Sequence, residues 1–354
     1  MSGHGGGPAP GHDLITLGRV GVDLYPQQTG VPLAEVRTFA KSLGGTATNV
    51  AVAAARHGLH TAVVTGVGDD PWAPYVRSAL RAFGVDDGGV VTVPGLQTPV
   101  VFCEIHPPDD FPILFYRRPV APDQCLTAEA LDLTALARAR MVWITGSGLA
   151  VEPTRSTTLL AAAQAGPATD VVLDLDWRPS FWAEPHTAAH WYAQALHTAT
   201  VAVGNRDETE VAVGTRDPDR AADLLLERGV RLAVVKQGPD GVLARTAHEE
   251  VRMAPLPVRV VNGLGAGDAF GGALAAGLLA GRPLREVVET ANAAGALVAG
   301  RLACADDMPE PREIRALVAR AYRHRPGDPP LAVPPSPLRT PARSGTAAAR
   351  EAMA

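Results

Sequence analysis

The feature that most constrains the fold of this chain is the alternation of short β-branched runs with Ala- and Leu-rich stretches of helical length. The predicted strands are 13–18, 61–68, 141–146, 170–176, 201–205 and 232–238, and the predicted helices are 48–58, 72–84, 155–165, 218–229, 266–281 and 283–303. Apolar strands separated by helices favour a mostly parallel sheet with helices on both faces. We therefore expect an α/β three-layer sandwich, with ligands bound at the carboxyl ends of the strands.

Two segments interrupt this alternation. Residues 20–40 and 97–119 are typical of β-structure with turns, and the second contains a hairpin in which VVFCEI and ILFYRR flank HPPDDFP. Extended segments inserted into an α/β core predict a small separate sheet, which would act as a lid over a site. A hairpin that merely decorates the sheet edge is the alternative.

The two ends of the chain differ in composition from the middle. Residues 1–12 are rich in Gly, Pro and His, and residues 326–354 form a Pro-rich tail. Neither stretch has enough apolar residues to bury a core, so we expect both to be disordered around one domain spanning 13–325.

Composition excludes several classes of function. The net charge is −5, which gives no basic field for nucleic acid or an anionic membrane surface. No apolar run is long enough for a membrane span, and no signal peptide is evident. Three cysteines without paired spacing argue against a zinc ribbon or a disulfide scaffold. We expect a soluble cytoplasmic protein with no nucleic-acid or membrane partner.

A glycine-rich window, VVNGLGAGDAFGG, carries a single carboxylate at Asp268. We expect it to follow a strand over 253–262 and to open a helix near Ala266. Glycines at a helix start leave N–H groups free to bind phosphate or a developing oxyanion, and an acid in the first helical turn can accept a proton from a hydroxyl. A tightly packed helix start with a capping acid is the alternative. The window matches neither the dinucleotide fingerprint nor the P-loop pattern.

A second glycine pair, Gly44–Gly45, precedes the helix that carries Asn49. Glycines let a small polyol approach the backbone closely, and the Asn49 amide can both donate and accept hydrogen bonds. A turn with a helix cap would explain this motif if it stood alone.

Together, in this order, the two motifs closely resemble the signatures of the ribokinase-like (PfkB) carbohydrate kinases over about residues 13–322. The resemblance implies a kinase that transfers the ATP γ-phosphate to a sugar hydroxyl. It also implies that Gly265, Ala266 and Gly267 form an anion hole and that Asp268 is the catalytic base.

Further residues match the same family. The resemblance places Asn205 and Glu208 at the phosphates and at Mg²⁺, with Glu208 acting through water, and it places Lys236, Gly238 and Asn292 at the nucleotide. A solvent-facing helix acid is the alternative for Glu208. Asp23 matches the acid that binds sugar hydroxyls beneath the lid.

The loop departs from the family pattern before its GAGD core. Asn262 stands where the family usually has Asp, and Gly263 and Leu264 replace two threonines. In some relatives that Asp helps bind a monovalent cation, so the resemblance does not extend to a potassium requirement.

Two arginines suggest the substrate class. Arg178 lies in DLDWRPSFW, which resembles an element of kinases acting on keto-deoxy sugar acids with Asp176 in place of Asn, and Arg117 matches a lid arginine of those relatives. An arginine pairs in a bidentate manner with a carboxylate, which a neutral sugar lacks. The segments 16–58 and 98–117 resemble the subgroup that phosphorylates such an acid on its terminal hydroxyl in inositol catabolism. Solvated strand arginines are the alternative.

Other functions remain as competing hypotheses. Kinases for 2-dehydro-3-deoxygluconate or fructose share the chemistry, an NAD-dependent oxidoreductase would use the glycine loop differently, and a sugar-sensing pseudokinase would lack turnover. Lid-to-lid homodimers occur in the family, so a homodimer through the lid is an expectation from the resemblance.

Overall fold

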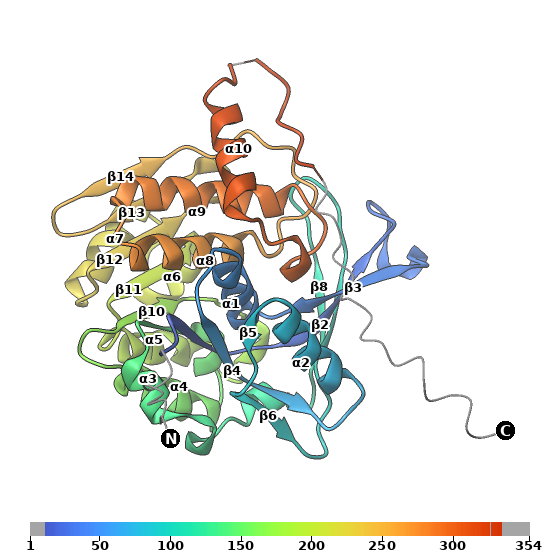
Figure 1. Ribbon diagram of the computed structural model, residues 1–354, viewed down its shortest axis with the longest axis vertical. Coiled ribbons are helices and arrows are strands. Elements are labelled where there is room, and N and C mark those ends of the chain that lie inside the picture. The colour runs from blue at the N-terminus through green and yellow to red at the C-terminus, as the bar shows by residue number, and fades with distance from the viewer. Residues whose placement is uncertain (1–10, 326, 335–354) are drawn as a thin grey trace, which may run out of the picture.

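The main sheet of the protein lies between two layers of helices. The computed structural model describes residues 11–325 and 327–334 (Figure 1). Within these residues the sheet has ten strands: β1 (Leu14–Leu17), β4 (Thr61–Gly68), β5 (Val85–Asp86), β6 (Val90–Val93), β9 (Met141–Thr145), β10 (Asp170–Asp174), β11 (Val201–Asn205), β12 (Leu232–Lys236), β13 (Val242–Arg245) and β14 (Glu250–Met253). The order is β14-β13-β12-β11-β10-β9-β1-β4-β5, with β6 also paired to β4. Only the β12–β13–β14 edge is antiparallel, which confirms the predicted mostly parallel sheet.

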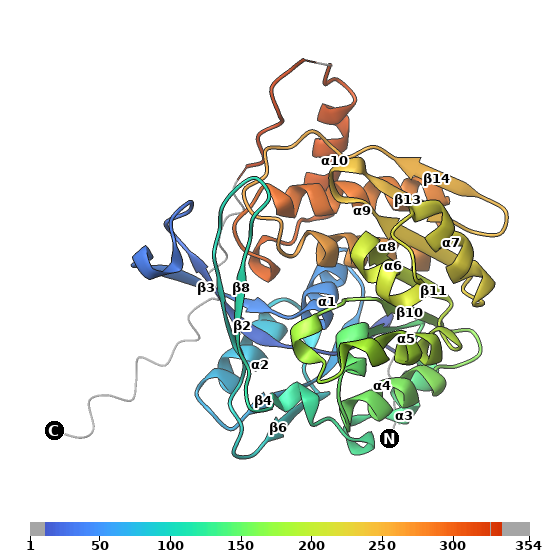
Figure 2. The same cartoon turned by 180° about the vertical axis from the view of Figure 1, so that it is seen from behind.

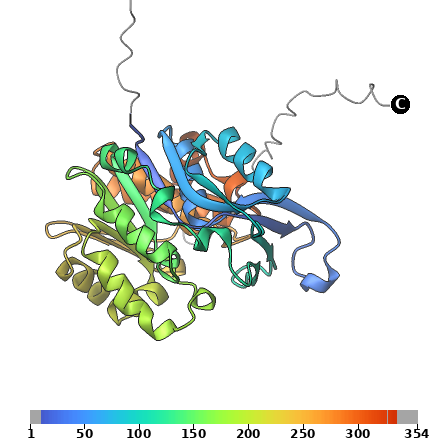
Figure 3. The same ribbon diagram turned by 90° about the horizontal axis from the view of Figure 1, so that it is seen from below.

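Helices cover both faces of this sheet. On one face lie α1 (Thr46–Arg56), α2 (Trp72–Ala82), α8 (Ala266–Leu279), α9 (Leu284–Ala299) and α10 (Pro311–Ala321), whose apolar side chains share one core. On the other lie α3 (Leu133–Arg138), α4 (Thr154–Ala163), α5 (Ala188–Leu196), α6 (Arg206–Val213) and α7 (Pro218–Glu227), which share the second core. Figure 3 shows α4, α5 and α7 on the opposite side of the sheet from α2.

Alternating side chains of the central strands feed the two cores. In β9, Met141 and Trp143 belong to the first core, whereas Val142 and Ile144 belong to the second, and all four are fully buried. This is why the strands read as continuous apolar runs rather than as alternating patterns. Trp143 is the largest fully buried side chain of the described residues, in cores built mainly from Ala, Val and Leu.

A separate small sheet contains four strands of the described chain: β2 (Gly21–Pro26), β3 (Phe39–Gly44), β7 (Val100–Cys103) and β8 (Ile113–Tyr116), in the order β3-β2-β7-β8. It comes from the two segments predicted to form such a sheet, although β3 extends to Gly44. The predicted hairpin is β7 and β8, and Figure 2 shows it as a long arm that reaches toward the loop before α8.

Two predictions about the chain near its C-terminus were wrong. Residues 254–262 form a loop rather than a strand, because Pro255 and Pro257 have no N–H to donate to a ladder. Part of the tail expected to be disordered packs on this loop and on the end of α9: Leu331 bridges to Val258, and the side chain of Val333 lies beside Gly300.

The other terminal predictions, for residues 1–10 and 335–354, lie outside the described residues. None of the helices in the described part of the chain is both long and apolar enough to span a membrane.

Candidate active site

Polar side chains gather where the parallel strands end. The chain leaves β1 at Gly18 and Arg19, and it leaves the neighbouring β9 toward Ser147. Asp174 ends β10, Asn205 ends β11 and Lys236 ends β12, so these residues share one edge of the sheet. β1 lies between β9 and β4, where the order of the strands reverses, and such switch points are where open α/β sheets bind ligands.

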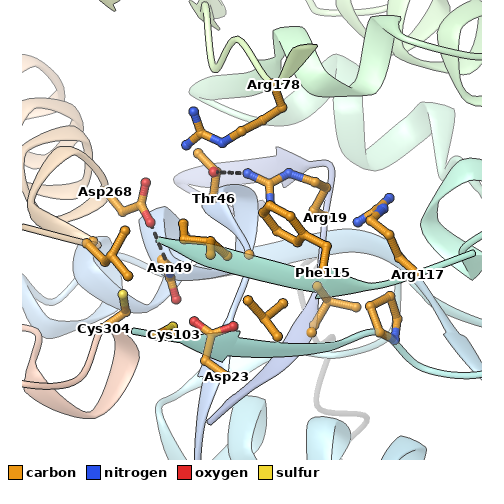
Figure 4. A pocket seen from close by; sticks show the side chains of 18 of the residues that line it. Arg19, Asp23, Thr46, Asn49, Cys103, Phe115, Arg117, Arg178, Asp268 and Cys304 are labelled. Carbon is orange, nitrogen blue, oxygen red and sulfur yellow. Dashed lines mark hydrogen bonds between the residues drawn. The ribbon is translucent and has the colours of Figure 1, made fainter. Parts of the chain in front are cut away.

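A cavity opens between this edge and the inner face of the small sheet (Figure 4). Of the residues predicted for the site, it is lined by Asp23, Gly45, Asn49, Arg117, Arg178, Gly265 and Asp268. Arg19, Thr46, Phe115, Cys103 and Cys304 also line it, and no role had been predicted for them. Charged side chains line different sides of the cavity: Asp268 and Asp23 lie near Asn49, and Arg19 and Arg117 lie on the other side. Figure 4 shows the Arg178 guanidinium above Thr46, between Asp268 and Arg19.

At the acidic end, Asp268 stands in the first turn of α8 beside Asn49 of α1. The amide Nδ2 of Asn49 donates to Asp268 Oδ2 at 2.8 Å, which fixes the carboxylate while leaving Oδ1 for a ligand. Burial raises the pKa of Asp268, and the Asn49 hydrogen bond opposes this shift. Asn49 Oδ1 is buried without a hydrogen-bond partner among the described residues, which is consistent with a missing donor such as a hydroxyl.

The loop before α8 requires glycine for two reasons. Gly265 has a left-handed φ of 78°, and a Cβ there would lie 2.5 Å from the sulfur of Cys304. A Cβ at Gly267 would lie 3.3 Å from Lys236 Nζ, so the Lys236 ammonium faces the first turn of α8. Backbone N–H groups at a helix start together with a cation form an anion-binding arrangement. Ala266 occupies the first position of this helix.

Asn262 supports this loop from beneath. Its side chain is fully buried, its Nδ2 donates to the Leu302 carbonyl at 2.7 Å, and its Oδ1 accepts from Leu264 N at 3.0 Å. An amide can make both bonds, whereas a carboxylate could make only the second.

Asp23 lies on β2, and its side chain reaches the cavity from the inner face of the small sheet. The Tyr25 hydroxyl donates to it at 2.9 Å, and burial raises the pKa of Asp23 to about 6. A Cβ at Gly44 would overlap the Asp23 carboxylate, and Gly45 has a φ of 101°. The two glycines therefore allow Asp23 and the start of α1 to approach each other.

At the other end, Asp176 links two arginines. Arg19 Nη2 donates to both Asp176 oxygens at 3.1 Å, and Arg178 Nη2 lies 3.1 Å from Asp176 Oδ1. Although burial favours the neutral acid, the charges of Arg19 and Arg178 hold the pKa of Asp176 below its usual value. Arg117 pairs instead with the buried Asp123 at 2.9 Å.

The residues predicted for the nucleotide lie beside the cavity rather than in its lining. Asn205 and Glu208 cap α6 reciprocally: Glu208 N donates to Asn205 Oδ1 at 2.9 Å, and Asn205 N donates to Glu208 Oε2 at 2.6 Å. Glu208 is buried, and its Oε1 lies 3.9 Å from Arg178, so it is not the solvent-facing acid of the alternative.

Lys236 has no ion pair within 4.0 Å among the described residues. Burial disfavours its charged form, but the carboxylates of Asp174 and Glu208 raise the pKa of Lys236 overall. Asn292 Nδ2 donates to the Ala254 carbonyl at 2.9 Å, and a side chain at Gly238 would meet open space.

Comparisons with known proteins agree with this geometry. The model of the pfkB family carbohydrate kinases matches residues 12–311. A 5-dehydro-2-deoxygluconokinase of Photobacterium profundum is 34% identical over 84% of this chain and 92% of its own length. The enzyme of the same name from Listeria monocytogenes is 32% identical over 87% and 96%.

Solved structures share the fold. A putative ribokinase II from E. coli, solved in apo form and with ATP and Mg²⁺, matches with TM-scores of 0.79 and 0.78 at 23% and 22% identity, covering 87% of this chain and 99% of that protein. The ribokinase-like fold predicted from the sequence is thus confirmed. PfkB kinases use ATP with Mg²⁺, and this chain belongs to the pfkB family of carbohydrate kinases.

Proposed function

We propose that the protein phosphorylates the terminal hydroxyl of 5-dehydro-2-deoxy-D-gluconate with ATP, giving the 6-phosphate and ADP in myo-inositol catabolism. The observation that carries this proposal is the opposite polarity of the two ends of the cavity. Asp268 and the glycine loop lie at one end, Arg19 and Arg117 lie at the other, and the Arg178 guanidinium lies between them. A substrate with a reactive hydroxyl at one end and a carboxylate at the other matches this arrangement, and the names of the relatives support it.

In the mechanism we propose, Asp268 accepts the proton of the terminal hydroxyl while Asn49 holds its other oxygen. Asp23 and the backbone at Gly44 and Gly45 bind the hydroxyls along the chain. Arg117 and Arg178 bind the carboxylate side. The small sheet closes over the sugar as a lid and excludes water from the transferred group.

The residues on the nucleotide side fit a phosphate-bearing ligand. The Lys236 ammonium, which has no ion pair with any described residue, and the amides of Gly265, Ala266 and Gly267 would neutralise the transferred phosphoryl group. Asn205 and Glu208 would hold Mg²⁺ through water, and the ion would supply charge neutralisation of the phosphates. Gly238 and Asn292 would flank the rest of the nucleotide.

The test is ADP release by purified protein with Mg-ATP and, in turn, 5-dehydro-2-deoxygluconate, 2-dehydro-3-deoxygluconate, fructose and ribose. Asp268→Asn is expected to lower kcat by about 10²–10⁴-fold, the usual contribution of a general base. Because burial disfavours the charged carboxylate that this change removes, the melting temperature of the Asp268→Asn variant should not fall. Glu286→Gln, a change at an exposed position in the first turn of α9, is the matched control for removing one carboxylate.

The outcomes separate the hypotheses. Turnover confined to the first acid and lost in Asp268→Asn supports both the kinase and the substrate. A preference for fructose or 2-dehydro-3-deoxygluconate would contradict our interpretation of the arginine end. Near-normal turnover by Asp268→Asn would contradict the assignment of the base.

We also propose a cytoplasmic homodimer that pairs through the small sheet. Leu114 and Tyr116 on its outer face are 47% and 61% exposed, and Phe102 packs edge-on against Tyr116. An exposed aromatic and aliphatic face of this kind favours association. Light scattering during size-exclusion chromatography, with Tyr116→Ser as the variant, tests this proposal.

A further inference from the structure

Arg19 is the most firmly held side chain at the arginine end of the cavity. Its Nε donates to Ser147 Oγ at 3.1 Å, and its Nη2 donates to Thr46 Oγ1 at 2.6 Å as well as to both oxygens of Asp176. The guanidinium also lies 5.3 Å from the centre of the Phe181 ring. Four neighbours from three segments of the chain therefore fix the plane of one guanidinium group.

The remaining nitrogen, Nη1, has no hydrogen-bond acceptor among the described residues. Nη1 is not completely enclosed by protein atoms, and Arg19 lines the cavity. Its two N–H groups are therefore open to a ligand, while the rest of the group is anchored.

The other two arginines are less free to accept a carboxylate. Arg117 already pairs with Asp123, whose side chain is 3% exposed, so a ligand that displaced this pair would leave a buried charge uncompensated. Arg178 lies between Asp176 at 3.1 Å and Glu208 at 3.9 Å, and its Nη1 donates to the Trp177 carbonyl at 2.9 Å. A ligand bound at Arg19 Nη1 breaks no ion pair.

We propose that Arg19 Nη1 is the principal donor to the carboxylate of the substrate, with Arg117 and Arg178 enclosing that group from either side. This inference rests on the proposed function, because it requires an acidic substrate. Asp176, Thr46 and Ser147 are positioning residues that hold the guanidinium before the substrate arrives. A guanidinium fixed in advance loses little side-chain freedom on binding, so more of its attraction appears as affinity.

The experiment compares Arg19→Lys with the wild type, using 5-dehydro-2-deoxygluconate and saturating Mg-ATP. Lysine keeps the charge beside Asp176 but has no second nitrogen that can reach the ligand. The free energy of a charge-assisted hydrogen bond corresponds to a change of about 10- to 150-fold in affinity, so we expect KM for the acid to rise by that factor. Because the carboxylate is remote from the reacting hydroxyl, kcat should change much less.

Arg245→Lys is the matched control. Arg245 is also a largely covered, multiply paired arginine, with Asp219, Asp223 and Glu250 around it, but it lies at the opposite edge of the sheet. The KM of the Arg245→Lys enzyme for the acid should equal that of the wild type. Circular dichroism melting of each variant reports folding.

Thr46→Val keeps the inference testable if Arg19→Lys does not fold. It removes the hydroxyl that accepts a hydrogen bond from Arg19 Nη2 and donates one to Asp176 Oδ1, without changing the charge of the site, and KM is expected to rise by about 3- to 10-fold. Calorimetric titration with D-gluconate and with D-glucitol adds a readout without turnover: the variants should weaken binding of the acid and leave binding of the neutral polyol unchanged.

An Arg19→Lys enzyme with KM within threefold of the wild type overturns the inference, as does an unchanged KM in Thr46→Val when Arg19→Lys is unfolded. Equal losses for D-gluconate and D-glucitol also overturn it. If the wild type does not phosphorylate the acid at all, the proposed function fails first, and the inference fails with it.

Discussion

Gly263 offers a direct test of contact between the small sheet and the glycine-rich loop before α8. Phe111 stands at the turn of the β7–β8 hairpin, and a Cβ added at Gly263 would lie 3.0 Å from its Cε2 and 3.1 Å from its Cδ2. Carbon atoms normally approach to about 3.5–4.0 Å. The φ of Gly263 is outside the left-handed region, so among the described residues the Phe111 ring alone would crowd a side chain there. Phe111 therefore explains why glycine stands where the family carries threonine.

The expected cost of Gly263→Thr follows from these distances. The Cβ alone would require the ring to move by about 0.5–1 Å, and threonine adds two further heavy atoms. Overpacking of this kind costs about 1–3 kcal/mol unless the neighbour moves. Because Phe111 lies on a hairpin turn, we expect the turn to be displaced, so KM for the acid should rise together with a lower melting temperature.

A double-mutant cycle with Phe111→Ala is the assay. Phe111→Ala alone loses the ring contact, but in the double variant it creates room for threonine, so the double variant should be more stable and more active than Gly263→Thr. We expect a coupling free energy within the 0.5–3 kcal/mol found for residues in contact. Additive effects of the two changes, or a Gly263→Thr enzyme equal to the wild type, would refute the reasoning.

Two further predictions concern buried polar groups. Since burial raises the pKa of Asp23 from 3.8 to about 6, its charged form destabilises the fold above pH 6, and protonation relieves this as the pH falls from about 6 to 4. Asp23→Asn should therefore be more stable than the wild type at pH 7.5, by up to about 3 kcal/mol, with the difference vanishing below pH 4 in denaturant titrations. A difference independent of pH would contradict this. Asn262→Asp should lower the free energy of unfolding by about 1–3 kcal/mol, because the Leu302 carbonyl loses its donor. Turnover by the wild type should be the same in KCl and in choline chloride. Equal melting temperatures, or stimulation by KCl, would count against that assignment.

The fold was predictable because its strands are buried on both faces. A run such as TAVVTGVG contains no charged residue, all eight of its residues are buried, and β4 covers the predicted residues 61–68. The strand predicted over 253–262 failed because its β-branched residues outweighed Pro255 and Pro257 in the prediction. The antiparallel β13–β14 hairpin ends at Met253, and the chain then runs as a loop. The β-branched residues favour a strand and the prolines oppose one, and in this segment the prolines decide the structure.

The acidic end of the cavity was easier to predict than the arginine end. Asp268 and Asn49 stand in glycine-rich motifs whose local pattern indicates their position. Arg19 and Asp176 are separated by 157 positions, and neither has a local motif that predicts an ion pair. The sequence indicates their position only indirectly: Arg19 and Asp176 each follow a predicted strand of the parallel sheet. Knowing that β9 lies between β1 and β10 is what brings the two together.

The side chains of β8 and its flanking residues connect the two ends of the site. Phe111, Ile113, Phe115 and Arg117 occupy alternating positions, and each is partly buried, whereas residues 112, 114, 116 and 118 are exposed. Side chains two apart on a strand share a face, and six residues of strand span roughly 20 Å. Phe111 contacts the loop before α8 at Gly263, Phe115 lines the cavity, and Arg117 reaches the arginine end. One strand therefore runs along the axis between the proposed base and the proposed carboxylate site. A substrate too short to reach the arginines would contact only part of this face, so we expect β8 to favour substrates long enough to span it.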